Sequence, residues 1–468
     1  MTPSALFRHS AFPVATMILA ACTPVGPDHQ TPAMELPASF SQGGVSWKRQ
    51  SPGSQPLARS WWRVYRDPTL NSLVERALAG NQNLKSAAAS VAQARALSRA
   101  ARTLYFPEID LGAGGDRSKM RIRMPGGGTT IMNSFSIPAD MSYELDVWGK
   151  VRRQVEAAEA SEGAATESLN AMRLSIAGEV AQTYWALRAV DADRKVLDET
   201  LEIRRKSLDL LGKRREAGTL SGLDYSRAEN EVASAEADRI QLDQQRSQLV
   251  NALAVLCGSV ATGSAVSENA SLPNPPAFPV SVPSALLRQR PDIRAAEHRV
   301  AAANADIGVA TAAFYPSFRI NASGGLDSAV FSNLFEASSL VWSLGADASV
   351  PLTRRGNLRA QRDAAVAAHE AASADYRQIV LDAIREVEDS LQGGSILARR
   401  HQAQDKATAA ARKTFELSSK QYQAGLISFL DVVDAERTRL DAERAANAIR
   451  AERLAISVSL AKALGGEW

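Results

Sequence analysis

The segment at residues 134–147, SFSIPADMSYELDV, alternates polar and apolar residues almost without exception. Its apolar positions are Phe135, Ile137, Ala139, Met141, Tyr143, Leu145 and Val147. A second segment, at 342–352, alternates in the same way, and shorter alternations follow Pro107 and Pro316. Because successive side chains of a strand point to opposite faces, these patterns predict four strands, each with one apolar and one polar face.

Two settings fit such strands: a soluble sheet that is half buried, or a membrane barrel whose apolar face contacts lipid. After residue 22 no apolar run reaches the roughly 18 residues of a transmembrane helix. A chain otherwise so helical favours the barrel. Open strand edges are not tolerated in lipid, so four strands require partner chains. Two copies would supply about eight strands and three about twelve, and the pattern alone does not choose between them.

The two halves of the chain form a repeat, which is seen when one half is shifted by 207 residues. The shift places Phe135 on Trp342 and Gly218 on Gly425. Each half then reads as helix, strand, loop, strand, very long helix, tight turn and helix. This period is far longer than that of a solenoid and indicates an internal duplication.

Very long helices are predicted by two proline-free blocks, 139–272 and 352–468. Between Ile176 and Leu211, positions spaced by four and three are mostly apolar, as in a coiled-coil seam, with Arg194 and Arg204 interrupting it. A helix over 150–216 would be roughly 100 Å long at 1.5 Å per residue.

Each long helix is expected to end at a glycine, Gly218 or Gly425. A serine and an acid then follow at capping-box spacing, Ser221 with Asp224 and Ser428 with Asp431. The chain should therefore contain two long helical hairpins whose tips lie far from the strands.

Composition excludes several classes of protein. The 468 residues carry 54 basic and 51 acidic side chains, so no charge excess points to nucleic acid. Two cysteines rule out a disulfide scaffold, and five scattered histidines without ligand spacing argue against a metal site. No combination of nucleophile and base suggests an enzyme, and no cofactor motif is present.

The N-terminal residues end in Leu19, Ala20, Ala21 and Cys22, which resembles a bacterial lipobox. The resemblance implies removal of residues 1–21 and a covalent diacylglycerol and fatty acyl group on Cys22. An ordinary secretory signal is the alternative. Thr23 replaces the aspartate that would retain a lipoprotein at the inner membrane, so the implied destination is the outer membrane.

Several long motifs carry a family resemblance. They are WWRVYRDPTL at 61–70, YELDVWGK at 143–150, RPDIRAAE at 290–297, ANADIG at 303–308, FYPS at 314–317, YQAG at 422–425 and LDVVDAER at 430–437. Together they resemble outer-membrane factors of the TolC/OprM type, in the NodT-like lipoprotein branch that serves RND efflux pumps. The resemblance runs from about Cys22 to the C-terminus.

The resemblance implies a mainly α protein with membrane β-strands. The implied assembly is a TolC-like homotrimer, in which four strands per chain share a 12-stranded β-barrel and the long coiled-coil helices form an α-barrel tunnel with an equatorial domain. The implied segments are a signal peptide (1–21), an N-terminal anchor and equatorial segment (22–68), a first repeat (69–275), and a second repeat with the C-terminal equatorial tail (276–468).

The resemblance also implies a passive duct in the outer membrane of a Gram-negative bacterium, with its tunnel in the periplasm. Its partners would be a periplasmic adaptor (membrane fusion protein), an inner-membrane RND transporter and outer-membrane lipid. A duct for type I protein secretion is an alternative. A coiled-coil scaffold or adaptor without a pore is an alternative from another class.

Site residues follow from matching the Tyr-x-x-Gly motif of the second hairpin. The implied periplasmic aperture consists of Leu430, Asp431, Asp434 and Arg437, and the gate-latch candidates are Asp224, Arg227 and Tyr422. Asp224 and Asp431 have a second interpretation as simple capping residues. Ile427 stands where some relatives carry a linking arginine, so Asp434 is expected to pair instead with Arg227 or Arg437. Lys119, Arg121 and Arg123 are expected to be solvated in an extracellular loop, although contact with lipopolysaccharide phosphates is an alternative.

Overall fold

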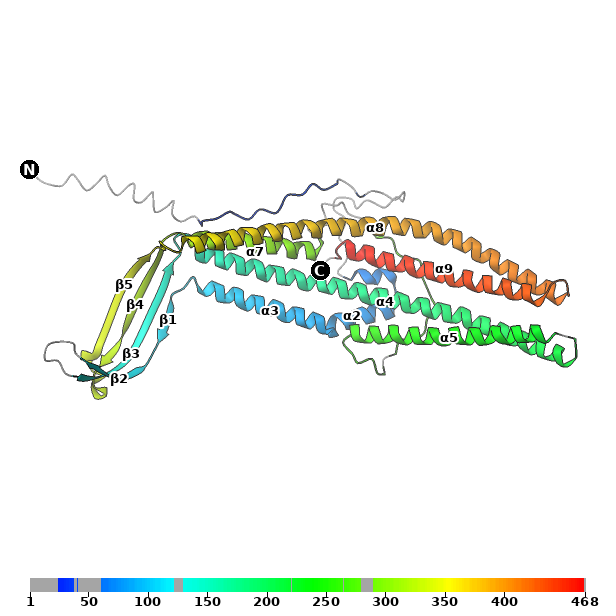
Figure 1. Cartoon of the computed structure of the whole chain (residues 1–468), viewed down its shortest axis with the longest axis horizontal. Coiled ribbons are helices and arrows are strands. Elements are labelled where there is room, and N and C mark those ends of the chain that lie inside the picture. Colours follow the sequence, from blue (N-terminus) through cyan, green and yellow to red (C-terminus); the bar gives the residue numbers. More distant parts are fainter. Residues whose placement is uncertain are drawn as a thin grey trace, which may run out of the picture. The chain divides into compact units, whose positions relative to one another are not determined.

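A computed structural model describes residues 24–37, 40, 60–121, 129–219, 221–263, 265–278 and 289–466. The chain divides into two compact units, each built from segments of both halves. Figure 1 labels the helices and strands of the chain. Unit 1 comprises Met1–Ala33, Ser90–Thr166 and Ala295–Arg377, and unit 2 comprises Met34–Ala89, Glu167–Arg294 and Gln378–Trp468. Among the described residues, no helix combines the length and apolar character that a membrane crossing needs.

Unit 1 contains one antiparallel sheet, in the order β1-β3-β4-β5, with β2 also pairing with β3. Its strands are β1 (Glu108–Leu111), β2 (Gly114–Arg121), β3 (Thr129–Leu145), β4 (Ser317–Ser328) and β5 (Leu340–Ser349). All four predicted strands are present, as β1, β3, β4 and β5, whereas β2 is a further strand that the sequence did not predict. Lys119 and Arg121, which we expected in a loop, lie within β2, whereas Arg123 lies outside the described residues.

The sheet has one continuous apolar face, as its register shows. Ile137 lies opposite Leu326, and Leu326 lies opposite Leu340. Further apolar pairs across the strands include Ile109 with Met141, Tyr143 with Ile320, Leu145 with Phe318, and Ala322 with Leu344. The face is most open on the outer strands, where Trp342 is 77% exposed and Leu111 is 79% exposed, whereas Ile137 and Tyr143 in the middle are partly buried. The alternating residues form a polar face, on which the amide of Asn321 donates to Asp347 at 2.6 Å.

The segment that begins at residue 24 packs on unit 1. The Val25 N–H donates to the Trp148 carbonyl at 3.0 Å, close to the start of helix α4 (Lys150–Glu216). Arg153 of that helix is almost fully buried and pairs with Asp28 at 2.8 Å. The chain just after Cys22 is therefore fixed beside the end of strand β3, while Cys22 itself lies outside the described residues.

Two long hairpins provide most of unit 2, joining α4 to α5 (Gly222–Leu256) and α8 (Arg355–Gln423) to α9 (Phe429–Ala463). The other helical elements of the described residues, in the two units together, are η1 (Trp61–Tyr65), α2 (Pro68–Gly80), α3 (Gln82–Thr103), α7 (Pro291–Ala312), η2 (Phe331–Asn333) and η3 (Ala337–Ser339). The bounds of α4 confirm the long helix predicted over 150–216.

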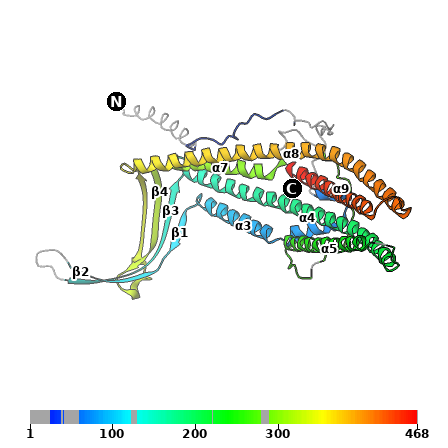
Figure 2. The same ribbon diagram turned by 45° about the vertical axis from the view of Figure 1, so that its right-hand side comes forward.

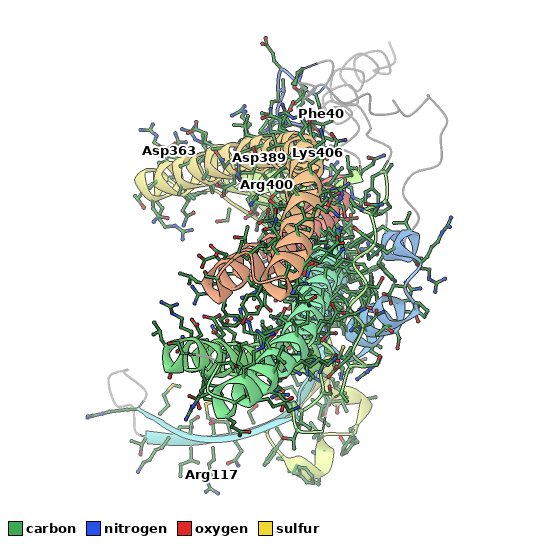
Figure 3. The ribbon with its side chains drawn as sticks, turned by 90° about the vertical axis from the view of Figure 1, so that its right-hand side faces the viewer. Phe40, Arg117, Asp363, Asp389, Arg400 and Lys406 are labelled. Carbon is green, nitrogen blue, oxygen red and sulfur yellow. The ribbon has the colours of Figure 1, made fainter. Side chains whose placement is uncertain are left out.

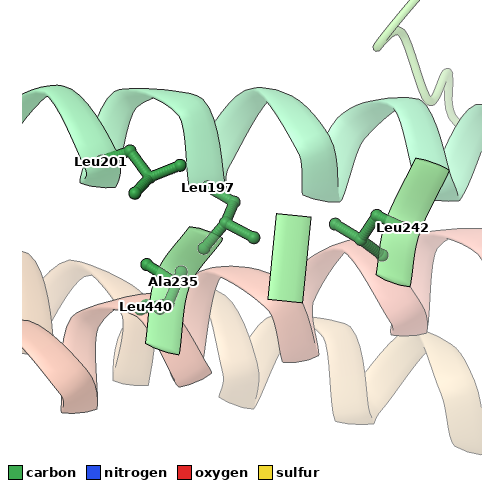
Figure 4. Close-up of a cluster of buried hydrophobic side chains, with 5 residues drawn as sticks. All are labelled: Leu197, Leu201, Ala235, Leu242 and Leu440. Carbon is green, nitrogen blue, oxygen red and sulfur yellow. The ribbon is translucent and has the colours of Figure 1, made fainter. Parts of the chain in front are cut away.

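The hairpins share an apolar core, part of which Figure 4 shows. Leu197 and Leu201 of α4 pack with Ala235 and Leu242 of α5 and with Leu440 of α9. Leu197 is completely buried, as expected for a seam position. The first hairpin thus packs against the second within one chain.

Both arginines of the seam form ion pairs, and Arg204 is buried while Arg194 is partly buried. The side chain of Arg194 is 12% exposed and contacts Asp243 at 3.0 Å and Glu268 at 2.8 Å. Arg204 is 6% exposed and contacts carboxylates from two helices, as described below. The apolar period found the seam, but it could not reveal that charges fill two of its positions.

A close approach joins α8 and α9. A Cβ added to Gly393 in the middle of α8 would lie 2.3 Å from Cδ1 of Ile456 in α9. Glycine inside a helix costs about 1 kcal/mol relative to alanine. Here its missing side chain makes the space that the isoleucine occupies.

Candidate functional site at the hairpin tips

Both hairpin turns have the same backbone geometry. Gly218 and Gly425 each adopt φ = +74°, a conformation that residues with a Cβ rarely adopt. The residue after each glycine donates to a carbonyl five positions back. These bonds are Thr219 N–H to Arg214 O (3.0 Å) and Leu426 N–H to Gln421 O (2.9 Å). The pattern is a Schellman motif, so the glycines end α4 and α8 as the sequence predicted.

The helix starts after the turns differ. Ser428 and Asp431 form a complete capping box: the Ser428 N–H donates to Asp431 Oδ2 at 2.9 Å, and the Asp431 N–H donates to Ser428 Oγ at 3.4 Å. The hydrogen bonds from Ser428 hold the pKa of Asp431 below its ordinary value. At the first tip, Ser221 Oγ accepts from the Leu223 N–H at 3.2 Å instead. The predicted box is thus confirmed for the second hairpin and wrong for the first.

The charged candidates pair within and between the hairpins. Asp224 contacts Arg227 at 3.4 Å on its own helix. Arg437 of α9 crosses to Glu231 of α5, with its Nε donating to Glu231 Oε2 at 3.3 Å. This bond holds the pKa of the Arg437 guanidinium above its usual range. In this chain Arg227 thus contacts Asp224 and Arg437 contacts Glu231, and the pairing of Asp434 in a closed entrance stays a prediction.

The remaining aperture candidates present side chains at the surface of the tip. Asp431 and Asp434 are exposed, one turn apart on α9. Leu430, between the cap and the first turn, is 40% exposed. Two carboxylates and one leucine are thus available for contact with other molecules.

Tyr422, a latch candidate, packs into a small core. It lies beside a buried cluster of Leu211, Ala228, Phe429 and Val433. Its ring centroid is 5.7 Å from that of Phe429, and the Arg214 guanidinium lies over its other side at 5.8 Å. The tyrosine therefore joins the two hairpins through apolar and cation–π contacts.

A buried charge cluster, defined by Arg204, Glu231 and Glu436, joins three helices just behind the tips. Arg204 of α4 contacts Glu231 of α5 at 3.1 Å and Glu436 of α9 at 3.5 Å. Its Nη1 also donates to the Glu231 carbonyl at 2.7 Å. All three side chains are at most 8% exposed. Sequence reasoning missed this cluster, although Arg204 at a seam position was the signal that could have found it.

Glu436 is the least satisfied member of the charge cluster. Among the described residues, no hydrogen-bond partner reaches its buried Oε1. Burial raises the pKa of Glu436 above its ordinary value, more than the nearby Arg204 lowers it. The carboxyl lines a cavity of about 200 Å³ that all four long helices enclose, together with Tyr422, Phe415 and Leu210. An imperfectly paired buried charge beside a cavity is a weakly held contact between the hairpins.

Within the described residues, no cluster of His, Cys, Asp or Glu side chains could hold a metal ion. The tips instead combine matched turns, exposed carboxylates and a charged contact between hairpins.

The fold is that of an outer-membrane channel of the TolC-like type. The structure of the outer-membrane channel OprN superposes with a TM-score of 0.88 at 31% identity, over 95% of this chain and 99% of that one. The Campylobacter jejuni outer-membrane channel CmeC shares the fold, with a TM-score of 0.89 at 23% identity and 95% coverage of both chains.

The chain belongs to the outer membrane efflux protein family, whose sequence profile matches residues 73–259 and 282–466. The family is one of channels rather than enzymes, and it resides in the outer membrane. The probable efflux pump outer membrane protein SepC of Pseudomonas putida is 32% identical over 460 residues, which is 97% of this chain and 95% of SepC. Outer membrane protein OprJ of Pseudomonas aeruginosa is 31% identical over 475 residues, covering 98% and 97%.

Proposed function

We propose that three copies of this chain form the passive exit duct of a tripartite efflux pump for drugs or other small molecules. The observation that carries the proposal is the two-faced sheet of unit 1. Its apolar face extends across β1, β3, β4 and β5 and is partly or fully exposed in the single chain, as lipid contact requires. Its polar face would line the pore.

Three copies are proposed because the sheet has edges. β1 and β5 end the strand order, and unpaired edges are not tolerated in hydrocarbon. Three sheets of this kind would close a barrel of about twelve strands, wide enough for a solute path. Two copies would leave an interior filled by side chains.

The entrance is proposed to lie at the hairpin tips. Three-fold symmetry would bring three copies each of Asp431 and Asp434 around one axis. Like charges in a narrow ring attract cations and repel one another. A closed entrance of this kind is easily biased toward opening by a partner that binds the tips better when they are apart. The proposed partners are a periplasmic adaptor and an inner-membrane RND transporter, in keeping with the efflux pumps named for SepC and its relatives.

Conductance in planar bilayers tests the duct and its entrance. The double variant D431A/D434A should lose cation selectivity and become less sensitive to block by divalent or hexammine cations. E202A is the matched control, because Glu202 is an exposed helix acid that pairs with Lys206. If the double variant conducts like E202A, the aspartates act only as surface and cap residues. A wild-type protein without conductance would favour a scaffold without a pore.

Type I protein secretion is the alternative use of such a duct. It predicts that deletion of the gene impairs export of a protein and leaves drug susceptibility unchanged. For efflux, deletion should lower the minimum inhibitory concentrations of small molecules.

Lipid attachment at Cys22 is the proposed anchor. The packing of Val25 and Asp28 on unit 1 supports it, because the modified residue would then stand close to the sheet that enters the membrane. Replacing Cys22 with serine should abolish labelling by radioactive palmitate while some protein still inserts. Continued labelling of C22S would remove the anchor from the proposal.

A further inference from the structure

A row of cations continues the apolar face of the sheet. β1 and β2 pair with β3 in a single register, Leu111 opposite Ala139 and Gly115 opposite Phe135. Alternate residues along β1 and β2 therefore share one face with the apolar side of β3. Along that face the order is Ile109, Leu111, Ala113, Gly115, Arg117, Lys119 and Arg121. Along this face the apolar side chains end at Ala113 and the positively charged side chains begin at Arg117, with Gly115 between them.

The three cations, which we name the cationic row, are not neutralised by the hairpin that carries them. Their partners on β3 are Asn133, Ile131 and Thr129. The nearby acid, Asp116, lies on the opposite face of the same strand. All three side chains are exposed, and among the described residues none forms an ion pair. The row therefore carries three positive charges available to an anion.

The cationic row begins where the apolar band ends. Phe135, opposite Gly115, packs edge-to-face with Phe331 at 5.5 Å between ring centroids. Phe331, Phe335 and Trp342 are all more than 60% exposed. Exposed aromatic side chains gather at the interface between hydrocarbon and headgroups in membrane sheets. β2 and the part of β3 paired with it run on beyond the other strands, and Arg117 projects from β2 (Figures 2 and 3).

We infer that Arg117, Lys119 and Arg121 bind the phosphates of a phosphorylated glycolipid in the outer leaflet, that is, lipopolysaccharide. The inference rests on the proposed function, in which the apolar face contacts lipid. Alternate strand residues are about 7 Å apart, so the row can contact several phosphates of one or two lipids. Guanidinium groups bind phosphate oxygens through paired hydrogen bonds, which suits Arg117 and Arg121. Lys119 adds a point charge between them.

Two variants of the full-length protein test the cationic row. The first, R117Q/K119Q/R121Q, removes the charges. The second, R117S/S118R/K119M/M120K, keeps the composition and moves two of the cations to the opposite face. Each protein is placed in phosphatidylcholine nanodiscs and titrated with fluorescent lipopolysaccharide, with dephosphorylated lipopolysaccharide and inorganic phosphate as separate arms.

The wild-type protein should bind lipopolysaccharide at least about tenfold more tightly than either variant, because two or three charge-assisted contacts are lost. It should also prefer the phosphorylated lipid, and millimolar inorganic phosphate should not displace that lipid. Equal binding by wild type and the triple variant overturns the inference, as does wild-type binding by the face-moving variant. If dilute inorganic phosphate displaces the lipopolysaccharide, the ligand of the cationic row is free phosphate rather than the lipid, and the inference is overturned.

Conductance of the same proteins separates this inference from the proposed duct. A triple variant that conducts normally but keeps wild-type lipopolysaccharide affinity refutes the cationic row alone. If the wild type and the triple variant bind lipopolysaccharide equally and the wild type also does not conduct, both the cationic row and the proposed duct are refuted.

Discussion

The two hairpin tips share a backbone and differ in their charges. Gly218 and Gly425 have the same φ and the same Schellman bonds. The second tip then closes a full capping box around Asp431, whereas Asp224 of the first tip contacts Arg227. Duplication thus kept the turn, where only glycine fits, and let the side chains around it diverge.

The comparison teaches where the tips depend on each other. Arg437 of the second hairpin pairs with Glu231 of the first, and Arg204 of the first contacts Glu436 of the second. The tips are therefore not independent helix ends. Breaking one of these contacts should therefore destabilise the tips of both hairpins.

The largest effect is expected from removing Arg204. Methionine at this position would leave Glu231 and Glu436 buried with less positive charge, which typically costs about 3–5 kcal/mol. R204M should therefore lower the midpoint of chemical denaturation, followed by circular dichroism in detergent. Hydrogen exchange of the amides at both tips should rise.

The neighbouring Arg205 provides the control for this variant. Its pair with Glu236 lies at the surface, with side chains 61% and 46% exposed. Such pairs contribute about 0–1 kcal/mol. If R205M and R204M destabilise the protein equally, the charge cluster does not couple the hairpins.

A smaller effect should distinguish the caps. S428A removes the hydroxyl of the complete box and should cost about 1 kcal/mol. S221A should cost less, because Ser221 makes only the bond to Leu223. Hydrogen exchange of the first turns of α9 and α5 measures the difference. Greater loss of protection in S221A would contradict the ranking of the two tips.

The smallest effect is a pH dependence at Glu436. Its raised pKa means that the folded protein holds this proton more tightly than the unfolded chain. The resulting stabilisation is present below the ordinary glutamate pKa of about 4.3 and is lost as pH rises through the raised folded value. Wild type should therefore become less stable relative to E436Q across that window, as measured by melting temperature at a series of pH values.

Glu416 provides the opposite sign as a control. The hydrogen bond from Lys420 lowers the pKa of this exposed residue, so its contribution is lost as pH falls rather than as it rises. The Glu436 effect would be refuted if wild type and E436Q kept the same stability difference at every pH.

Sequence patterns predicted the backbone better than the charges. The alternation of polar and apolar residues located the strands. The proline-free block, with apolar residues recurring every 3.5 positions, predicted α4 with the bounds that the structure has. Glycine marked both turns because a positive φ excludes other residues. Ion pairs have no comparable period: the partner of Arg437 is 206 positions away, at Glu231. The aperture residues and the lipid on Cys22 stay predictions.

The glycine in the middle of α8 limits how the second hairpin can rearrange. Because Ile456 occupies the space of the missing Cβ, sliding α8 along α9 by one helical turn would bring a residue with a Cβ, such as Ser390, against the Ile456 side chain. Of the two usual motions of packed helices, shear (sliding along each other) is therefore disfavoured, and hinge bending is the motion that remains. Contact between Ile456 and Gly393 therefore fixes the lengthwise alignment of α8 and α9, while the outer ends of the two helices can still bend apart.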